Sequence, residues 1–395
     1  MFRCLPSGAA ESETVMILTV RILYFALCAV LLALLLCGGS VGCLALLCAL
    51  LLLPLGQLAL DMHCRKAVRA VMEAPANTGK NEPFRVVLRL ENASRLPVLA
   101  AGCGFTVKNL LTGASERVVR RTAILPRGQG EVVLELSSDC CGRIRTELTS
   151  LRLYDCFWLI PVRCRAEAHA SVTVQPDTFS MEVRVLANVN SPEESEVYSQ
   201  ERPGSDLTET FQIRDYREGD SIRQIHWKLS TKYDRLISRD PSLPVTRSVM
   251  VFWDRRVEEI SRARQDAQAE VLVSLCRALL AADVQFTLAW NESGRCVLQR
   301  AAELDDLIAL LPRLLSTGAC TDGPDGAELY CRTETGSAFA HVVYVAEAAP
   351  AALEQMTDGA VTALICADAA AAPERAACRC FTAESYAETL TELTI

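Results

Sequence analysis

Two long apolar runs near the start of the chain constrain its fold more than any other feature. Residues 15–37 and 41–60 are almost entirely apolar, and only a Gly-Gly-Ser connection separates them. About twenty helical residues, at about 1.5 Å each, cross the roughly 30 Å hydrocarbon layer of a bilayer. Arg21 lies near the start of the first run, where its long side chain can reach the membrane interface. The pattern predicts two transmembrane helices within residues 15–60, joined as a hairpin.

The basic residues around these runs predict the side of the membrane. Arg65, Lys66 and Arg69 follow the second run and Arg3 precedes the first, whereas the connection carries no charge. By the positive-inside rule, both ends of the hairpin face the cytoplasm. We therefore expect a cell membrane protein with a cytoplasmic segment at residues 1–14 and its remaining domains on the cytoplasmic side.

Cysteine usage points to the same compartment. The 395 residues include 18 cysteines, which are scattered, often lie inside apolar runs and form no C-x-x-C pair. We interpret them as reduced thiols, which the cytoplasm maintains. A cleaved signal peptide followed by a buried helix is the alternative for the two runs, and the acidic Glu11 and Glu13 ahead of them disfavour it.

Residues 67–176 change to a pattern of alternating apolar and polar positions, separated by turn clusters. This alternation is typical of strands with one buried face. Several such strands in about 110 residues predict an all-β domain of the immunoglobulin-like sandwich type. The apolar positions that carry the alternation most clearly are Phe84, Val86, Leu88, Leu90, Val132, Leu134 and Leu136.

Charge separates the next two parts of the chain. Residues 177–210 include the run VNSPEESEVYSQERPGSD, which has little to bury and predicts a solvated linker region. Residues 211–240 then hold seven Lys or Arg and five Asp or Glu, interleaved with aromatic residues. The net charge of −8 and the pI near 5.3 argue against a nucleic-acid partner, because such proteins usually carry excess Lys and Arg.

The local pattern in the charged segment 211–240 predicts a short helix. Gly219-Asp220 has the character of a turn and an N-cap, and Ile222, Ile225 and Leu229 follow at helical spacing. One hypothesis is a salt-bridged clamp that docks the linker on the last domain. A second is a binding site for an anionic group, formed by arginine side chains and an aromatic platform.

Two further hypotheses for this segment assign it chemistry or a nucleic-acid ligand. His226 as a base, oriented by Asp215 or Asp220 and with Arg223 nearby, would make an enzyme that acts on an anionic substrate. No serine or cysteine in a nucleophile elbow accompanies them. Single-stranded nucleic acid stacked on aromatic residues is the other hypothesis, and the acidic chain disfavours it.

The segment also resembles a known family. The pattern Gly-Asp-x-x-Arg-x-Ile-x-Trp-Lys-x-Ser, preceded by Arg-x-Tyr, is similar to the signature of the bacterial domain of unknown function 58. Upstream, Cys141-Gly-Arg143 and Asp155-x-Phe157 resemble further segments of that family, although Cys156 and Trp158 replace its usual Pro and Gly. The residues that match the signature are Arg214, Tyr216, Gly219, Asp220, Arg223, Ile225, Trp227, Lys228 and Ser230.

The resemblance implies an architecture and a set of partners. Members of the family join a membrane hairpin and a β-domain to a von Willebrand factor A-like domain. They often accompany MoxR-type AAA+ ATPases and transglutaminase-like membrane proteins. The resemblance implies no particular biochemical activity.

Residues 241–395 alternate apolar runs with helical stretches. This alternation predicts βαβ crossovers and a mainly parallel sheet. It agrees with the von Willebrand factor A-like fold that the resemblance implies. In such sheets ligands bind beyond the carboxyl ends of the strands, and Asp254 directly follows an apolar run.

The residues around Asp254 argue against a metal site. A working metal-ion-dependent adhesion site would show Asp-x-Ser-x-Ser, whose oxygens suit a hard divalent ion. This chain has Asp254-Arg-Arg256-Val-Glu258 instead. We expect the guanidinium groups of Arg255 and Arg256 to pair with the carboxylate and repel a cation, so we predict a degenerate position without metal or cofactor.

These observations predict a membrane-anchored interaction or assembly protein without enzymatic activity. Its partners would be the lipid bilayer and a protein, which the resemblance suggests is a MoxR-type AAA+ ATPase or a transglutaminase-like membrane protein. The role would lie in maturation of envelope or membrane complexes. The alternative is an enzyme that acts on an anionic substrate through His226, Asp220 and Arg223.

Overall fold

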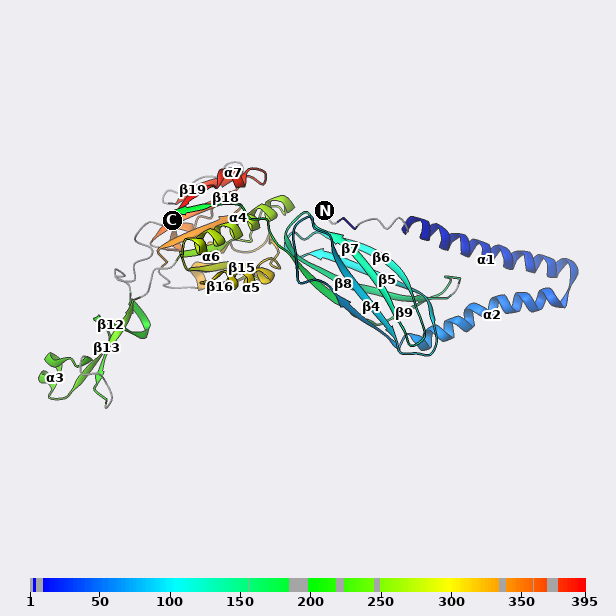
Figure 1. The fold of residues 1–395 in the computed structure, drawn as a ribbon, viewed down its shortest axis with the longest axis horizontal. Coiled ribbons are helices and arrows are strands. Elements are labelled where there is room, and N and C mark those ends of the chain that lie inside the picture. Colours follow the sequence, from blue (N-terminus) through cyan, green and yellow to red (C-terminus); the bar gives the residue numbers. More distant parts are fainter. Residues whose placement is uncertain are drawn as a thin grey trace. The chain divides into compact units, whose positions relative to one another are not determined.

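The computed structural model describes residues 3–4, 10–155, 157–184, 198–217, 224–244, 249–333, 339–357, 359–367 and 376–395. These residues form two compact units (Figure 1). The first comprises Met1–Asp177 together with Leu311–Gly318, and the second comprises Thr178–Leu310 together with Ala319–Ile395. The short stretch Leu311–Gly318 thus groups with the first unit, whereas the sequence predicted all of 241–395 as one domain.

The first unit opens with two apolar helices, as predicted. Helix α1 covers Ala10–Gly38 and helix α2 covers Val41–Cys64. Ser40 caps α2, because its hydroxyl accepts a hydrogen bond from the backbone N–H of Cys43 at 3.2 Å. The stretches Ile17–Gly38 and Val41–Cys64 are long and apolar enough to cross a membrane. Helix α1 begins earlier than the apolar run, so the acidic residues ahead of that run are helical too.

From Ile17 onward, where burial is described, a narrow stripe of these helices is covered within the chain. In α1 the buried apolar residues Ile17, Tyr24 and Leu31 recur every seven positions, which places them on one face. The Tyr24 hydroxyl donates a hydrogen bond to the Leu50 carbonyl of α2 at 3.3 Å. The other faces expose many large apolar side chains, which is typical of helices that face lipid.

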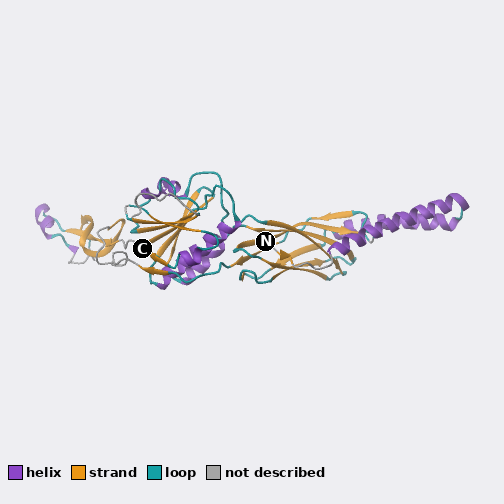
Figure 2. Ribbon diagram, turned by 90° about the horizontal axis from the view of Figure 1, so that it is seen from above, coloured by secondary structure: helices purple, strands orange, loops and turns teal. Residues whose placement is uncertain are grey.

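The helices lead into a domain made of strands, drawn in orange in Figure 2. A four-stranded sheet has the order β1-β7-β4-β2 and a second sheet the order β3-β10-β8-β5-β6, with β9 paired to β8. Their inward side chains share one apolar core, so the two sheets form a sandwich. The strands are β1 (Arg3–Cys4), β2 (Val68–Glu73), β3 (Asn77–Thr78), β4 (Phe84–Asn92), β5 (Val98–Asn109), β6 (Ser115–Ile124), β7 (Gln129–Ser137), β8 (Gly142–Tyr154), β9 (Pro161–Cys164) and β10 (His169–Val174).

Two details of this domain compare directly with the sequence pattern. The alternating apolar residues of β4 and β7 point into the core, since Phe84, Leu88 and Leu134 are all buried. The N-terminal segment does more than lead into the helices, because Arg3 and Cys4 pair as β1 with the end of β7. Burial raises the pKa of the core thiol of Cys103 to about 12, so this thiol is protonated and packs as a small apolar group.

The second unit contains a six-stranded sheet of order β16-β15-β14-β17-β18-β19. All neighbouring strands are parallel except the β15–β16 pair, so the sheet is mainly parallel. Its strands are β14 (Val249–Trp253), β15 (Phe286–Glu292), β16 (Arg295–Ala301), β17 (His341–Ala346), β18 (Ala360–Cys366) and β19 (Ala377–Phe381). The accompanying helices are α4 (Arg262–Ala281), α5 (Leu304–Leu314), α6 (Gly326–Thr333), α7 (Tyr386–Thr389) and the short η4 (Leu353–Gln355).

The strand order changes direction at β14. The chain runs from β14 to β15 on one side, and returns to add β17 on the other side. In parallel sheets such a switch point leaves a crevice beyond the carboxyl ends of the two strands, because their connections leave in opposite directions. The carboxyl ends of β14 and β17 are therefore where this sheet offers a site.

Two smaller sheets complete the second unit. Strand β11 (Glu182–Arg184) pairs in parallel with β20 (Glu392–Thr394), and β12 (Tyr198–Asp215) pairs antiparallel with β13 (Ile237–Pro244). The predicted linker region 177–210 thus includes strand residues at both of its ends. Pairing explains the difference, because a polar sequence can form a strand when its backbone bonds a neighbour instead of burying side chains.

The sequence places the start of the helix predicted in the charged segment 211–240 at Gly219-Asp220, which lies outside the described residues. The described helix α3 covers Trp227–Tyr233, and its N-cap is His226. Ile225, expected within the helix, forms an isolated bridge with Ser238 of β13. Pairing with β13 keeps this residue extended, so the helix can begin only two residues later.

Candidate functional site

A cavity of about 740 Å³ opens where the sheet switches direction. Residues that directly follow β14, β17 and β18 line it, together with residues that precede α6. We call this region the rim. Its charged lining residues are Asp254, Arg256, Glu258, Glu259, Arg264, Asp325 and Glu347.

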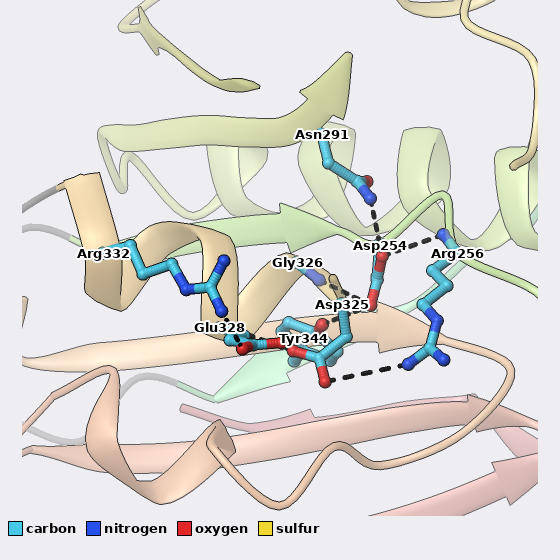
Figure 3. A network of polar contacts seen from close by, with 8 residues as sticks. All are labelled: Asp254, Arg256, Asn291, Asp325, Gly326, Glu328, Arg332 and Tyr344. Carbon is cyan, nitrogen blue, oxygen red and sulfur yellow. Dashed lines mark hydrogen bonds and ion pairs between the residues drawn. The ribbon is translucent and has the colours of Figure 1, made fainter. Parts of the chain in front are cut away.

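Asp254 is the centre of the rim's hydrogen-bond network (Figure 3). It follows β14, is only 3% exposed, and receives four hydrogen bonds. Oδ1 accepts from the backbone N–H of Arg256 at 2.9 Å and from the Asn291 amide at 3.0 Å. Oδ2 accepts from the backbone N–H of Gly326 at 3.0 Å and from the Tyr344 hydroxyl at 2.6 Å. A carboxylate has about four acceptor positions, so this set fills them.

The donors come from three different elements and from the loop after β14, which supplies the backbone N–H of Arg256. Asn291 belongs to β15, Tyr344 to β17 and Gly326 to the start of α6. Gly326 must be a glycine at this approach, because a Cβ there would overlap the Phe252 ring. Burial, and next the nearby Asp254 charge, raise the pKa of Tyr344, so its hydroxyl stays a hydrogen-bond donor.

The predicted pairing of Asp254 with guanidinium groups needs correction. Arg256 bonds Asp254 through its backbone, while its guanidinium lies 4.0 Å from the Asp325 carboxylate. The Arg255 side chain is fully buried and stacks on the Trp253 ring, 4.0 Å from its centroid. The bonds to Asp254 described above thus come from two backbone N–H groups, an amide and a hydroxyl, and not from the predicted guanidinium groups.

The residues of the rim do not fit a divalent ion. Asp254 could coordinate a metal only by giving up buried donors, and Arg256 stands where a hydroxyl ligand would be needed. Glu258 is exposed. In the part of the chain that the structure describes, no group of three or more His, Cys, Asp or Glu side chains is arranged to hold a metal.

Two further acids shape the cavity. Asp325 caps α6, since its Oδ1 accepts a hydrogen bond from the backbone N–H of Glu328 at 2.7 Å. Glu347 follows β17, and its side chain is 7% exposed and 3.9 Å from the Arg264 guanidinium. Burial raises the pKa of Glu347. The positive charges of Arg264 and Arg255 lower it in part, but burial has the larger effect.

The charged segment 211–240 has a different character. Ser230 is buried and links α3 to β13, because its hydroxyl donates to the His226 carbonyl at 3.0 Å and accepts from the Ile237 N–H at 2.9 Å. Trp227 is 60% exposed, and Lys228 is exposed beside it. These contacts give Ser230 a structural role and leave the Trp227 ring on the surface.

The remaining residues of the family signature are partly described. Tyr216 donates its backbone N–H to Leu236 at 3.0 Å, and Arg214 is half-buried on β12. Gly219, Asp220 and Arg223 lie outside the described residues. The structure therefore shows how the two ends of the signature are held and not its centre.

The catalytic hypothesis placed a base at His226. Its Nδ1 accepts a hydrogen bond from the backbone N–H of Leu229 at 3.3 Å, which makes the ring a helix cap. Asp215, proposed to orient it, has its carboxylate 3.3 Å from the Arg235 guanidinium. The described contacts of both residues are those of a folded surface segment.

Sequence reasoning missed most of the rim. It identified Asp254, Arg256 and Glu258, but not Asn291, Glu347 or the donors from α6 and β17. A usable signal was present for two of them. Glu347 directly follows an apolar strand, and Asn291 lies near the end of another, so a search for polar residues at every strand end would have found both.

Comparisons with known proteins do not assign a family. No protein-family model matches the chain, and no curated protein shows significant similarity to it. A CARDB domain from Pyrococcus furiosus is 10% identical, with a TM-score of 0.20, over 27% of this chain and 87% of that one. A cohesin module from Clostridium perfringens is 10% identical, with a TM-score of 0.22, over 28% and 98%. Scores at this level carry no argument about function.

Proposed function

We propose that this chain is a membrane-anchored interaction protein whose rim binds a protein partner on the cytoplasmic side. Two helices of sufficient length and apolarity support the anchor. The basic residues that flank them support the cytoplasmic placement. The proposal assigns no catalytic residue, because the rim's central carboxylate is committed to structural hydrogen bonds.

The observation that carries the proposal is the charged cavity at the sheet's switch point. Five acids and two arginines line it. Asp254 is fully bonded, and two ion pairs join Arg256 to Asp325 and Arg264 to Glu347. The exposed Glu258 and Glu259 then give the opening an excess of negative charge.

This charge pattern favours a partner segment that carries Lys or Arg. A basic side chain in the cavity would pair with the glutamates at its edge, and complementary charge would fix its register. A hydroxyl-and-metal site of the adhesion type would instead receive an acidic residue. The rim would therefore recognise a partner of the opposite charge.

We also propose the family and the partner class. The signature in 211–240 and the order of hairpin, β-sandwich and mainly parallel sheet suit the domain of unknown function 58. On that assignment the sandwich is immunoglobulin-like, the sheet is von Willebrand factor A-like, and the partner is a MoxR-type AAA+ ATPase or a transglutaminase-like membrane protein. The role is assembly or maturation of envelope or membrane complexes.

Affinity capture of the detergent-solubilised full chain tests this function. The rim variant Glu258→Lys with Glu259→Lys places positive charge at the cavity edge. Since each reversed charge contact at this exposed edge costs about 1 kcal/mol, partner binding should weaken about tenfold or more. The matched control is Glu384→Lys with Glu388→Lys, two exposed acids of the same unit that do not line the cavity.

The two variants separate the possible results. Loss of a defined partner in the rim variant, with the control unchanged, supports the proposal. Equal recovery by the wild-type chain and both variants would place the binding surface elsewhere. Equal loss in both variants would indicate a nonspecific effect of charge, and would also count against the rim.

A further inference from the structure

The loop between β8 and β9 carries the apolar run Phe157-Trp158-Leu159-Ile160. All four side chains are half-buried, although the loop lies at the end of a β-domain whose core is complete without them. Loops are usually polar because they face water. The exposed half of each of these apolar side chains therefore calls for apolar surroundings outside the β-domain.

The backbone of this loop is satisfied from within the protein. The buried Asp155 carboxylate accepts hydrogen bonds from the N–H groups of Phe157, Leu159 and Ile160, at 3.1, 2.7 and 2.8 Å. The Trp158 N–H bonds the Asp155 carbonyl at 3.0 Å. Trp158 has a φ of 59°, a left-handed conformation that these bonds hold in place. Irregular backbone near hydrocarbon requires such internal partners.

The loop also contacts helix α1. The guanidinium of Arg21 donates to the Trp158 carbonyl, with the Nε bond at 2.9 Å. The ring of Phe157 packs on that of Tyr24, with 4.8 Å between centroids. These contacts attach the β-domain to the helix at two successive turns.

The height of these contacts on α1 places the loop relative to a bilayer. The apolar span begins at Ile17, so Arg21 and Tyr24 lie four and seven residues inside it. At about 1.5 Å per residue, Tyr24 is about 10 Å along the helix from the start of the span. If α1 crosses the membrane over this stretch, the loop reaches the same depth.

We propose that Phe157–Ile160 inserts into the headgroup and upper acyl region of the bilayer beside α1. This inference rests on the membrane anchoring proposed above. Tryptophan prefers this region because its ring is apolar and its N–H remains hydrated. The Arg121 guanidinium lies 5.3 Å from the centre of the Trp158 ring, and the Tyr154 ring lies 4.7 Å from it, so the region of the loop carries the aromatic and basic side chains typical of the membrane interface. Lipid is the occupant because the loop continues the apolar surface of the hairpin.

The insertion gives Arg21 and the sandwich defined roles. An arginine within an apolar span needs an acceptor, and the Trp158 carbonyl supplies one. The β-domain then has a second membrane contact besides the hairpin. Two contacts fix the tilt of the domain against the bilayer, so the sandwich is an oriented support and not a freely swinging spacer.

Tryptophan quenching by lipids brominated near the top of the acyl chain tests the insertion. The full chain is reconstituted in vesicles and compared with Trp158→Tyr and Trp227→Tyr, with tryptophan-selective excitation. The core residues Trp253 and Trp290 are fully buried and contribute an unquenched background. We expect quenching in the wild type, its loss in Trp158→Tyr, and its retention in Trp227→Tyr.

The contrary results are equally clear. An unquenched wild type, or equal quenching in Trp158→Tyr, would mean that the loop only packs against a part of α1 that lies outside the lipid. Trp158→Phe repeats the test if the tyrosine variant does not fold. Alkaline carbonate extraction separates the two levels of the argument. A chain that resists extraction but is not quenched refutes the loop insertion alone, and a chain that is extracted refutes the anchor as well.

Discussion

The rim and the charged segment 211–240 are both rich in ionic side chains, but they use them in opposite ways. At the rim, Asp254 is 3% exposed and every acceptor position is filled. In the segment, the ion pair of Asp215 and Arg235 has side chains that are 65% and 62% exposed. A dense run of charges marks a solvated surface, whereas a single buried acid marks a constructed site. The comparison predicts that a substitution at the rim lowers the free energy of unfolding more than a substitution in the charged segment.

The largest difference should come from removing one acid in each region. Asp254→Ala leaves the buried donors of Asn291, Tyr344 and Gly326 without their acceptor. Each such donor costs about 1–3 kcal/mol, so we expect the free energy of unfolding to fall by about 3 kcal/mol or more. Asp215→Ala removes only an exposed pair, worth about 0–1 kcal/mol. Urea denaturation followed by tryptophan fluorescence measures both, and equal effects would remove the contrast.

The next largest effect is a pH dependence of the free energy of unfolding, which comes from His341 in β17. Burial lowers the pKa of His341 from 6.5 to about 4, and its Nε2 lies 2.8 Å from the Thr362 hydroxyl. The unfolded chain therefore takes up a proton below about pH 6.5 that the folded chain refuses until about pH 4. Stability should fall by about 3 kcal/mol as the pH drops through this range.

His341→Gln isolates that contribution. The variant lacks the titrating group, so its stability should change less between neutral pH and pH 4 than that of the wild type. Other groups titrate in the same range, and the difference between the two chains removes their shared contribution. Identical pH profiles would show that His341 is protonated as easily in the folded chain as in the unfolded one.

A smaller loss of stability is expected at Ser230, whose hydrogen bonds join α3 to β13 in the charged segment. Ser230→Ala removes the acceptor of the Ile237 N–H and the donor to the His226 carbonyl. Loss of such bonds costs about 1 kcal/mol. Amide hydrogen exchange at Ile237 should accelerate about fivefold, which is the population change that 1 kcal/mol produces. Unchanged exchange at this amide would mean that the bond does not join α3 to β13.

The smallest change in the free energy of unfolding is expected from substitution of Trp227 in the charged segment. Trp227 is 60% exposed, so Trp227→Ala should change the free energy of unfolding by no more than about 0.5 kcal/mol. The ring is not needed for packing within the described part of the segment, so its loss should leave the fold intact. A variant that folds normally but loses its partner would move the binding site from the rim to the segment.

The parts of the structure that follow from the sequence are those set by local periodicity. The apolar runs give α1 and α2, and alternation at Phe84, Val86 and Leu88 gives a strand with one buried face. The sheet in the second unit follows from the alternation of strands and helices, because parallel strands require crossovers. In each case the pattern of nearby residues in the sequence is enough to predict the element.

The rim could not be predicted in this way, because its donors are distant in the sequence. Asn291, Gly326 and Tyr344 reach Asp254 only because the ends of β15 and β17 and the start of α6 meet at the same edge. The prediction for Ile225 is wrong for a similar reason. Its spacing predicts a helical residue, but its pairing with the distant Ser238 keeps it outside α3.

Photocrosslinking in intact cells tests the central claim most directly. A photoreactive amino acid replaces Glu259 at the rim in one chain, and Lys232, an exposed residue of α3, in the other. The account predicts a discrete protein adduct from position 259 that the Glu258→Lys substitution abolishes, and no such adduct from position 232. An adduct formed only from position 232 would contradict the account, as would an adduct from position 259 that persists after the charge at the rim is reversed.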